Sequence, residues 1–114
     1  MFIVYELKLS GGKRYFGTTP KWRKDTRLAE HHAGTGSMWT QLYPPVKNDT
    51  VAGTWEVPTR EEAYKFENEL TEDYLRANGI DSARGGLCNF REPGSYKFWV
   101  RKHLRYLVPN EYKW

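Results

Sequence analysis

Two hydrophobic runs near the N-terminus predict a β-hairpin. Residues 2–7 read Phe-Ile-Val-Tyr-Glu-Leu and residues 14–18 read Arg-Tyr-Phe-Gly-Thr, and both have the β-branched and aromatic content typical of strands. Residues 10–12, Ser-Gly-Gly, lie between them and supply the positive φ that a tight turn requires. Residues 50–57 alternate in part and are bounded by turn residues, so we expect a third strand there.

Helical spacing predicts a first helix from about Pro20 to Ala33, ending at Gly34. Thr18 and Thr19 can cap it, Pro20 is tolerated in a first turn, and glycine is the usual residue after a helix end. Two stripes are expected on this helix. One is expected to face the core and contains Trp22, Thr26, Ala29 and Ala33; the other contains Arg23, Arg27 and His31.

A second helix is expected to begin after Thr59, with Glu62 at the capping-box position, and to end at Asn78-Gly79. Its apolar residues recur with a period near 3.6 at Ala63, Phe66, Leu70, Tyr74 and Ala77. Glu67 falls on the border of this inward face. A carboxylate there is costly unless it is paired or binds a metal, so both a rim ion pair and a metal ligand are open interpretations.

The remaining segments predict a loop, a connection and a last helix. Residues 34–40 are typical of a turn that leads into a short element, and residues 83–90 of a glycine-rich connection. A helix over about residues 95–107 would interleave basic and aromatic side chains. This pattern suits contacts with phosphates and stacked bases, and it equally suits an amphipathic helix packed on the sheet.

Composition narrows the class of protein. A chain of 114 residues with five Trp, eight Tyr and five Phe is expected to form one domain, residues 1–114, with enough aromatic bulk for a core. The net charge of +4 favours a polyanionic partner only weakly. The single Cys88 cannot form an internal disulfide, which favours a reducing, cytoplasmic setting. We find no signal peptide and no apolar run near the ~20 residues that span a bilayer, so we expect no membrane partner.

Several short motifs occur in an order that resembles the GIY-YIG nuclease superfamily. In chain order they are Ile3-Val4-Tyr5, Tyr15-Phe16-Gly17, Arg27-x-x-x-His31, Gly-Thr-Gly-Ser-Met-Trp-Thr at residues 34–40, Ala63-x-x-x-Glu67, and Ala-Arg-Gly-Gly at residues 83–86. The loop at residues 34–40 resembles homing-endonuclease-like members, and the last motif resembles a branch common in viruses. The likeness covers about residues 2–90. The chain departs from the family pattern in two places, since the first motif lacks its glycine and Phe16 replaces an isoleucine.

The resemblance implies an α+β fold in which a small three-stranded antiparallel sheet is flanked by helices. It also implies hydrolysis of nucleic-acid phosphodiesters in a single displacement. Such a reaction needs a base, a cation for the pentavalent phosphorane and a metal ion on the leaving group. By analogy Tyr5 is the base, Arg27 binds the phosphate, His31 orients Tyr5 or accepts its proton, and Tyr15 hydrogen-bonds the phosphate or its water. Without the resemblance, the tyrosines are typical of cross-strand packing and the Arg/His pair of a solvated helix face.

The resemblance also implies the cofactor and the partner. Glu67 would be the sole protein ligand of one Mg²⁺, with Mn²⁺ as an alternative ion, and Asn89 is the best placed residue to steady the metal or its water. Nucleic acid, DNA rather than RNA, is the expected partner. The expected contacts to it are Arg23, Arg84, Lys97, Arg101, Lys102 and Arg105. Sequence specificity would then come from a homodimer or a protein partner, and the alternative is an inactive module of the same fold that binds nucleic acid or a protein.

Overall fold

The computed structural model describes residues 1–79 and 82–85. Its elements, in chain order, are β1 (Phe2–Lys8), the 3₁₀ turn η1 (Ser10–Gly12), β2 (Arg14–Pro20), the 3₁₀ turn η2 (Lys21–Arg23), α1 (Lys24–His32), α2 (Met38–Leu42), β3 (Val51–Val57), α3 (Arg60–Asn78) and β4 (Ala83–Gly85). The helix expected over residues 95–107 lies outside the described residues, as does Asn89.

The structure is an α+β fold built on one mixed sheet. The four strands have the order β3-β1-β2-β4, with β1 antiparallel to both β2 and β3, and β4 parallel to β2. The prediction of a purely antiparallel, three-stranded sheet is therefore wrong at this edge. The segment that the sequence presents as a connection forms a strand of only three residues. Gly85 fits there because a Cβ at its position would overlap the Phe16 carbonyl and the Thr71 hydroxyl.

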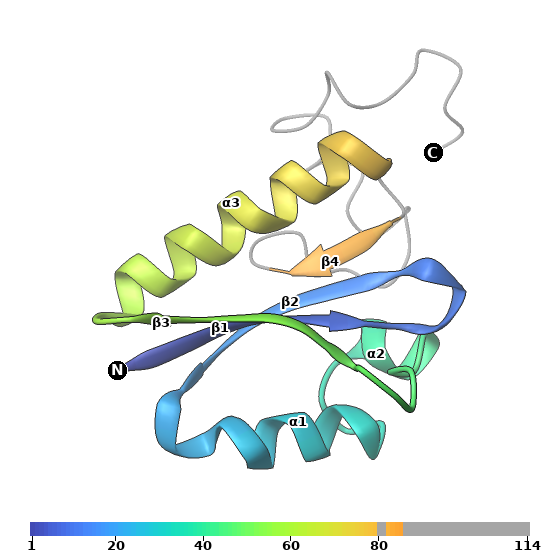
Figure 1. Ribbon diagram of the computed structural model, residues 1–114, viewed down its shortest axis with the longest axis horizontal. Helices are drawn as coiled ribbons and strands as arrows, with labels where there is room; N and C mark the ends of the chain where they lie inside the picture. The colour runs from blue at the N-terminus through green and yellow to red at the C-terminus, as the bar shows by residue number, and fades with distance from the viewer. Residues whose placement is uncertain (80–81, 86–114) are drawn as a thin grey trace.

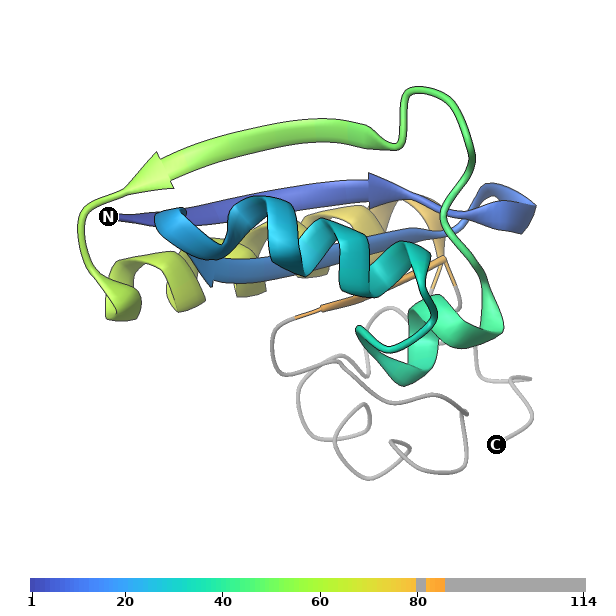
Figure 2. The same ribbon diagram turned by 90° about the horizontal axis from the view of Figure 1, so that it is seen from below.

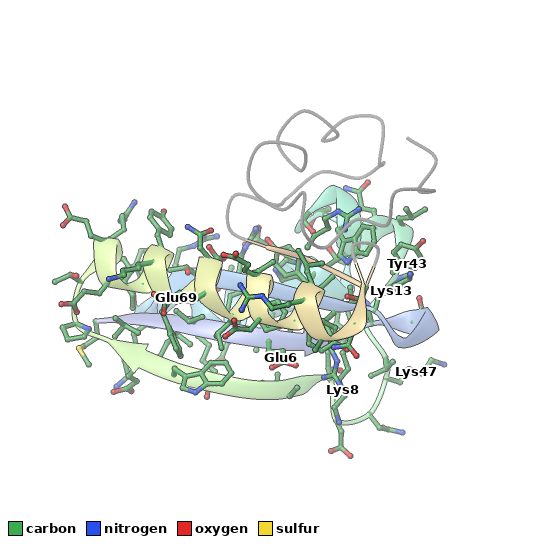
Figure 3. The ribbon with its side chains drawn as sticks, turned by 90° about the horizontal axis from the view of Figure 1, so that it is seen from above. Glu6, Lys8, Lys13, Tyr43, Lys47 and Glu69 are labelled. Atoms are coloured by element: carbon green, nitrogen blue, oxygen red, sulfur yellow. The ribbon has the colours of Figure 1, made fainter. Side chains whose placement is uncertain are left out.

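The hairpin prediction is confirmed in its turn as well as its strands. Gly11 and Gly12 have φ angles of 70° and 73°, a conformation that residues with a side chain rarely adopt. The Leu9 N–H donates to the Lys13 carbonyl at 2.9 Å and closes the turn. The Lys13 ammonium then lies 5.2 Å from the centre of the Tyr43 ring, which ties the hairpin to the chain that follows α2 (Figure 3).

Helix α1 presents the opposite face to the one expected. Strand β2 continues through Pro20, and η2 intervenes before the helix begins at Lys24. The stripe expected in the core is exposed, and Trp22 is 83% exposed. His31 is instead fully buried, with Arg27 partly buried beside it. The polar stripe points inward because its side chains find partners on the sheet, as described below.

Helices α1 and α3 lie on opposite sides of the sheet, α1 below and α3 above in Figure 1, and Figure 2 shows α1 running along its face. The second predicted helix is confirmed. The Thr59 hydroxyl accepts the Glu62 N–H at 3.2 Å, and the helix ends at Gly79 with φ 101°. None of the described helices is long and apolar enough to cross a membrane.

The core of the sheet is aromatic on the α1 side. Its buried cluster consists of Ile3, Tyr5, Leu7, Leu9, Tyr15 and Trp39, with Leu28 and Tyr43 packed against it. Two of these residues, Tyr5 and Tyr15, carry hydroxyl groups into the buried layer. They are the starting point of the candidate site.

Candidate active site

The β1–β2 hairpin places the Tyr5 and Tyr15 rings next to each other. Their ring centroids are 6.3 Å apart, and the residues are 1% and 5% exposed. Tyr5 lies opposite Gly17 in the β1–β2 register. A Cβ at Gly17 would overlap the Tyr5 ring, so the absence of a side chain there allows the ring to cross β2. The glycine of the second motif therefore has a steric role.

His31 contacts both tyrosines from α1. Its Nε2 lies 2.8 Å from the Tyr5 hydroxyl, and its ring centroid is 4.8 Å from that of Tyr15. Its Nδ1 lies 3.1 Å from the Thr40 hydroxyl, so both ring nitrogens have partners in the protein. A Cβ at Gly36 would overlap the imidazole, which shows how closely the loop before α2 approaches the ring.

Burial lowers the pKa of His31 to about 4, and the positive charges of Arg27 and His32 contribute in the same direction. The imidazole is therefore neutral at pH 7. One of its nitrogens carries a lone pair and can accept a proton.

Arg27 extends from the inward face of α1 toward the two tyrosines. Burial acts to lower the pKa of Arg27, but the Tyr5 and Tyr15 oxygens and Glu30 outweigh it and the pKa is raised. Its guanidinium also lies 3.4 Å from a Glu30 carboxylate oxygen. The side chain remains 24% exposed, so a phosphate arriving from solvent can reach it.

The two phenols are held in their neutral form. Burial raises the pKa of Tyr5, the Tyr15 oxygen and Glu67 raise it further, and the charge and hydrogen bonding of Arg27 lower it. Burial likewise raises the pKa of Tyr15, with Glu67 adding to the effect and Arg27 and Ser37 opposing it. Deprotonation of either phenol therefore needs additional positive charge in the site.

Glu67 of α3 acts electrostatically on the same cluster. It is 7% exposed and lies on the most buried line of the helix, at i, i+4, i+8 and i+12 with Ala63, Thr71 and Leu75. This placement is more central than the border position expected from the sequence. Its negative charge acts on both phenols, which puts its carboxylate in the same electrostatic environment as Arg27.

Charges from both sides of the sheet act on Tyr5, whose ring lies over β2 near the end of β4. Strand β4 pairs only with Arg14–Phe16 of β2, so among the described strands nothing covers that edge of β2 from Gly17 onward. The Tyr5 ring crosses β2 at this point. Arg27 from α1 and Glu67 from α3 both act electrostatically on the Tyr5 hydroxyl.

The residues present fit a divalent cation with one protein ligand. No group of three or more His, Cys, Asp or Glu side chains occurs among residues 1–79 and 82–85. Glu67 supplies a buried carboxylate whose charge acts on two phenols, and ionisation of those phenols requires positive charge. Mg²⁺ commonly binds through one or two carboxylates together with water and substrate phosphates, so this donor set suits it.

The predicted nucleic-acid contacts have different outcomes. Arg84 is fully buried, with its guanidinium 4.3 Å from the Trp39 ring centroid and Nη1 donating to the Ala83 carbonyl at 2.7 Å. Its burial follows from its place in strand β4, and its contact with nucleic acid stays a prediction. Arg23 is partly exposed and pairs with Glu30 at 2.7 Å. The other predicted contacts, Lys97, Arg101, Lys102 and Arg105, lie outside the described residues.

Sequence reasoning gave no site role to four residues that shape the site: Gly36, Ser37 and Thr40 around His31, and Glu30 beside Arg27. The first three stand in the motif at residues 34–40. The Ser-x-x-Thr spacing was the available signal. In the structure it forms a capping box at the start of α2, in which the Ser37 hydroxyl accepts the Thr40 N–H and the Thr40 hydroxyl accepts the Ser37 N–H.

Comparison with known proteins identifies no relative of this chain. No protein-family model, no curated protein and no solved structure matches it significantly.

Proposed function

We propose that this protein is a metal-dependent endonuclease that hydrolyses phosphodiester bonds of nucleic acid, with DNA as the preferred substrate. One observation carries the proposal: five side chains with complementary chemistry, distant in sequence, lie in one electrostatically coupled cluster. They are Tyr5, Tyr15, Arg27, His31 and Glu67. Their arrangement also supports the resemblance to the GIY-YIG superfamily as a proposal.

Each side chain supplies one requirement of phosphodiester hydrolysis. The proton of the Tyr5 hydroxyl passes to His31 Nε2, and the resulting phenolate takes a proton from the attacking water. The water oxygen forms the new bond to phosphorus as the bond to the leaving oxygen breaks. Arg27 neutralises the non-bridging oxygens as their charge increases, and Tyr15 donates a hydrogen bond to the phosphate.

Positive charge in the site controls this proton transfer and so links it to formation of the substrate complex. A divalent cation held by Glu67 would supply the positive charge that stabilises the leaving oxygen. In the protein alone, burial keeps Tyr5 protonated at neutral pH. The phenol would become a base only when positive charge offsets that burial, which confines the activity to the assembled complex.

The test is nicking of a supercoiled plasmid by the purified protein, with Mg²⁺ or Mn²⁺ and with excess chelator. We expect cleavage that requires the metal and is lost in Glu67→Ala. Glu69→Ala is the matched control, because this glutamate is exposed on the same helix (Figure 3). Circular dichroism of both variants separates loss of chemistry from loss of folding.

Two results would contradict the proposal. The first is a Glu67→Ala variant that nicks at the wild-type rate in Mg²⁺. The second is a wild-type protein that binds DNA but cleaves neither DNA nor RNA with either ion. That second outcome would favour the alternative, a catalytically inactive binding module.

A further inference from the structure

Thr40 holds His31 from the side opposite Tyr5. The residue is fully buried, and its hydroxyl oxygen lies 3.1 Å from His31 Nδ1. The same oxygen accepts the Ser37 N–H at 3.2 Å and lies 3.1 Å from the Ser37 carbonyl oxygen. The Ser37 hydroxyl is a further neighbour, at 3.0 Å. Thr40 is thus locked in place by the N-terminal turn of α2.

Counting protons favours one direction for these bonds. A hydroxyl has one proton to donate, and a neutral imidazole has one N–H. A carbonyl oxygen can only accept, so the contact between the Thr40 hydroxyl and the Ser37 carbonyl is favourable only when Thr40 donates to it. The Ser37 N–H takes one Thr40 lone pair, and one lone pair is left for His31 Nδ1 when the Ser37 hydroxyl directs its own proton elsewhere. In that arrangement His31 Nδ1 carries the imidazole proton.

This tautomer leaves the lone pair of His31 on Nε2, which faces the Tyr5 hydroxyl at 2.8 Å. In the opposite tautomer Nε2–H would donate to the Tyr5 oxygen, and the Tyr5 proton could not pass to His31. Thr40 would then donate its proton to His31 Nδ1, which would leave the Thr40 hydroxyl oxygen and the Ser37 carbonyl oxygen 3.1 Å apart without a proton between them. The capping turn of α2 therefore determines which way a proton can move between Tyr5 and His31.

We propose that Thr40 is a positioning residue that selects the Nδ1–H tautomer of His31 and so makes His31 the acceptor of the Tyr5 proton. The catalytic meaning of this role rests on the proposed nuclease function. Thr40 is fully buried and acts only through His31. When His31 becomes doubly protonated, its Nδ1–H remains hydrogen-bonded to Thr40 and the new proton lies on Nε2, so the charge is stabilised without any movement of the ring.

Substitution by valine removes the hydroxyl at nearly constant volume, and Thr40→Ser retains it. Thr19→Val is the matched control, because Thr19 is 2% exposed and its hydroxyl binds the Pro20 carbonyl away from the cluster. The first readout is the ¹⁵N spectrum of the histidine rings, with His31 assigned from a His31→Gln variant. We expect one Nδ1–H tautomer in the wild type, in Thr40→Ser and in Thr19→Val, and a mixed or reversed tautomer in Thr40→Val.

The second readout is plasmid cleavage. We expect Thr40→Val to lower kcat by about 10- to 100-fold with little change in KM, since a misplaced proton acceptor removes part of a general-base contribution of about 10²–10⁴-fold. Thr40→Ser should restore most of the rate.

The spectrum tests the tautomer independently of activity. An Nε2–H tautomer in the wild type would overturn the inference even if the valine variant failed to fold, and so would an unchanged tautomer in Thr40→Val. Full turnover in Thr40→Val, alongside an active wild type, would overturn the catalytic role of Thr40 and leave the nuclease proposal standing. The expected tautomers in a protein that cleaves nothing would support the positioning role and reject the nuclease.

Discussion

The buried, neutral His31 predicts that the protein loses stability on mild acidification. The pKa of His31 is about 4 in the folded protein, compared with 6.5 for an unperturbed histidine. Between these values the unfolded chain binds a proton that the folded protein excludes, so acid favours unfolding. The stabilisation is fully present above pH 6.5 and is lost as the pH falls toward 4. At pH 5 the two pKa values correspond to about 2 kcal/mol, and solvent screening lowers this to about 1–2 kcal/mol.

Urea unfolding between pH 7 and pH 5, followed by tryptophan fluorescence, measures this effect. Most carboxylates stay ionised in that range, so histidines dominate the change. We expect the wild type to lose about 1–2 kcal/mol of unfolding free energy, a large share of the roughly 5–15 kcal/mol typical of a domain. His31→Gln should be nearly flat across the range, whereas His32→Gln, at an exposed position, should keep the wild-type slope. A wild type with no slope, or the same slope in His31→Gln, would refute the assignment of a buried neutral imidazole.

Two further substitutions test the geometry of the cluster. Arg27→Ala should lower turnover by about 10²–10³-fold. Arg23→Ala should change mainly affinity, because Arg23 pairs with Glu30 and is not among the groups that shift the pKa of Tyr5 or Tyr15. Equal small effects of both variants in steady-state kinetics would show that this helix face is only a row of solvated cations. Gly17→Ala should lower the free energy of unfolding in urea by about 1–3 kcal/mol and impair turnover, because the new methyl group overlaps the Tyr5 ring. Wild-type stability and turnover in this variant would mean that the Tyr5 ring does not lie over β2.

The parts of the fold with local signals could be predicted from the sequence. The adjacent glycines at 11 and 12 specify the hairpin turn, because few other residues adopt two successive positive φ angles. Thr59 and the regular apolar spacing after it specify α3. In both cases the responsible interaction spans only a few residues.

The parts that depend on distant partners could not be predicted. Strand β4 has three residues and pairs in parallel with a strand almost seventy positions earlier, so no local pattern marks it. The predicted orientation of α1 was wrong for a related reason. An apolar stripe normally faces the core, but here the sheet offers Tyr5 and Tyr15 as partners for a polar stripe, and only His31 is fully buried in the helix.

This orientation makes the docking of α1 depend on the candidate site itself. The partly buried Leu28 is the residue of α1 that packs against the aromatic core, and the other inward groups are polar. The helix is therefore held largely by the His31 contacts to Tyr5 and Thr40 and by Arg27 at the phenols. A buried hydrogen bond stabilises only when both partners are present, and removing one leaves the other unsatisfied. Substitutions in this cluster should consequently loosen α1 as well as alter chemistry, so a loss of cleavage is evidence for a catalytic role only when the unfolding free energy of the same variant is known.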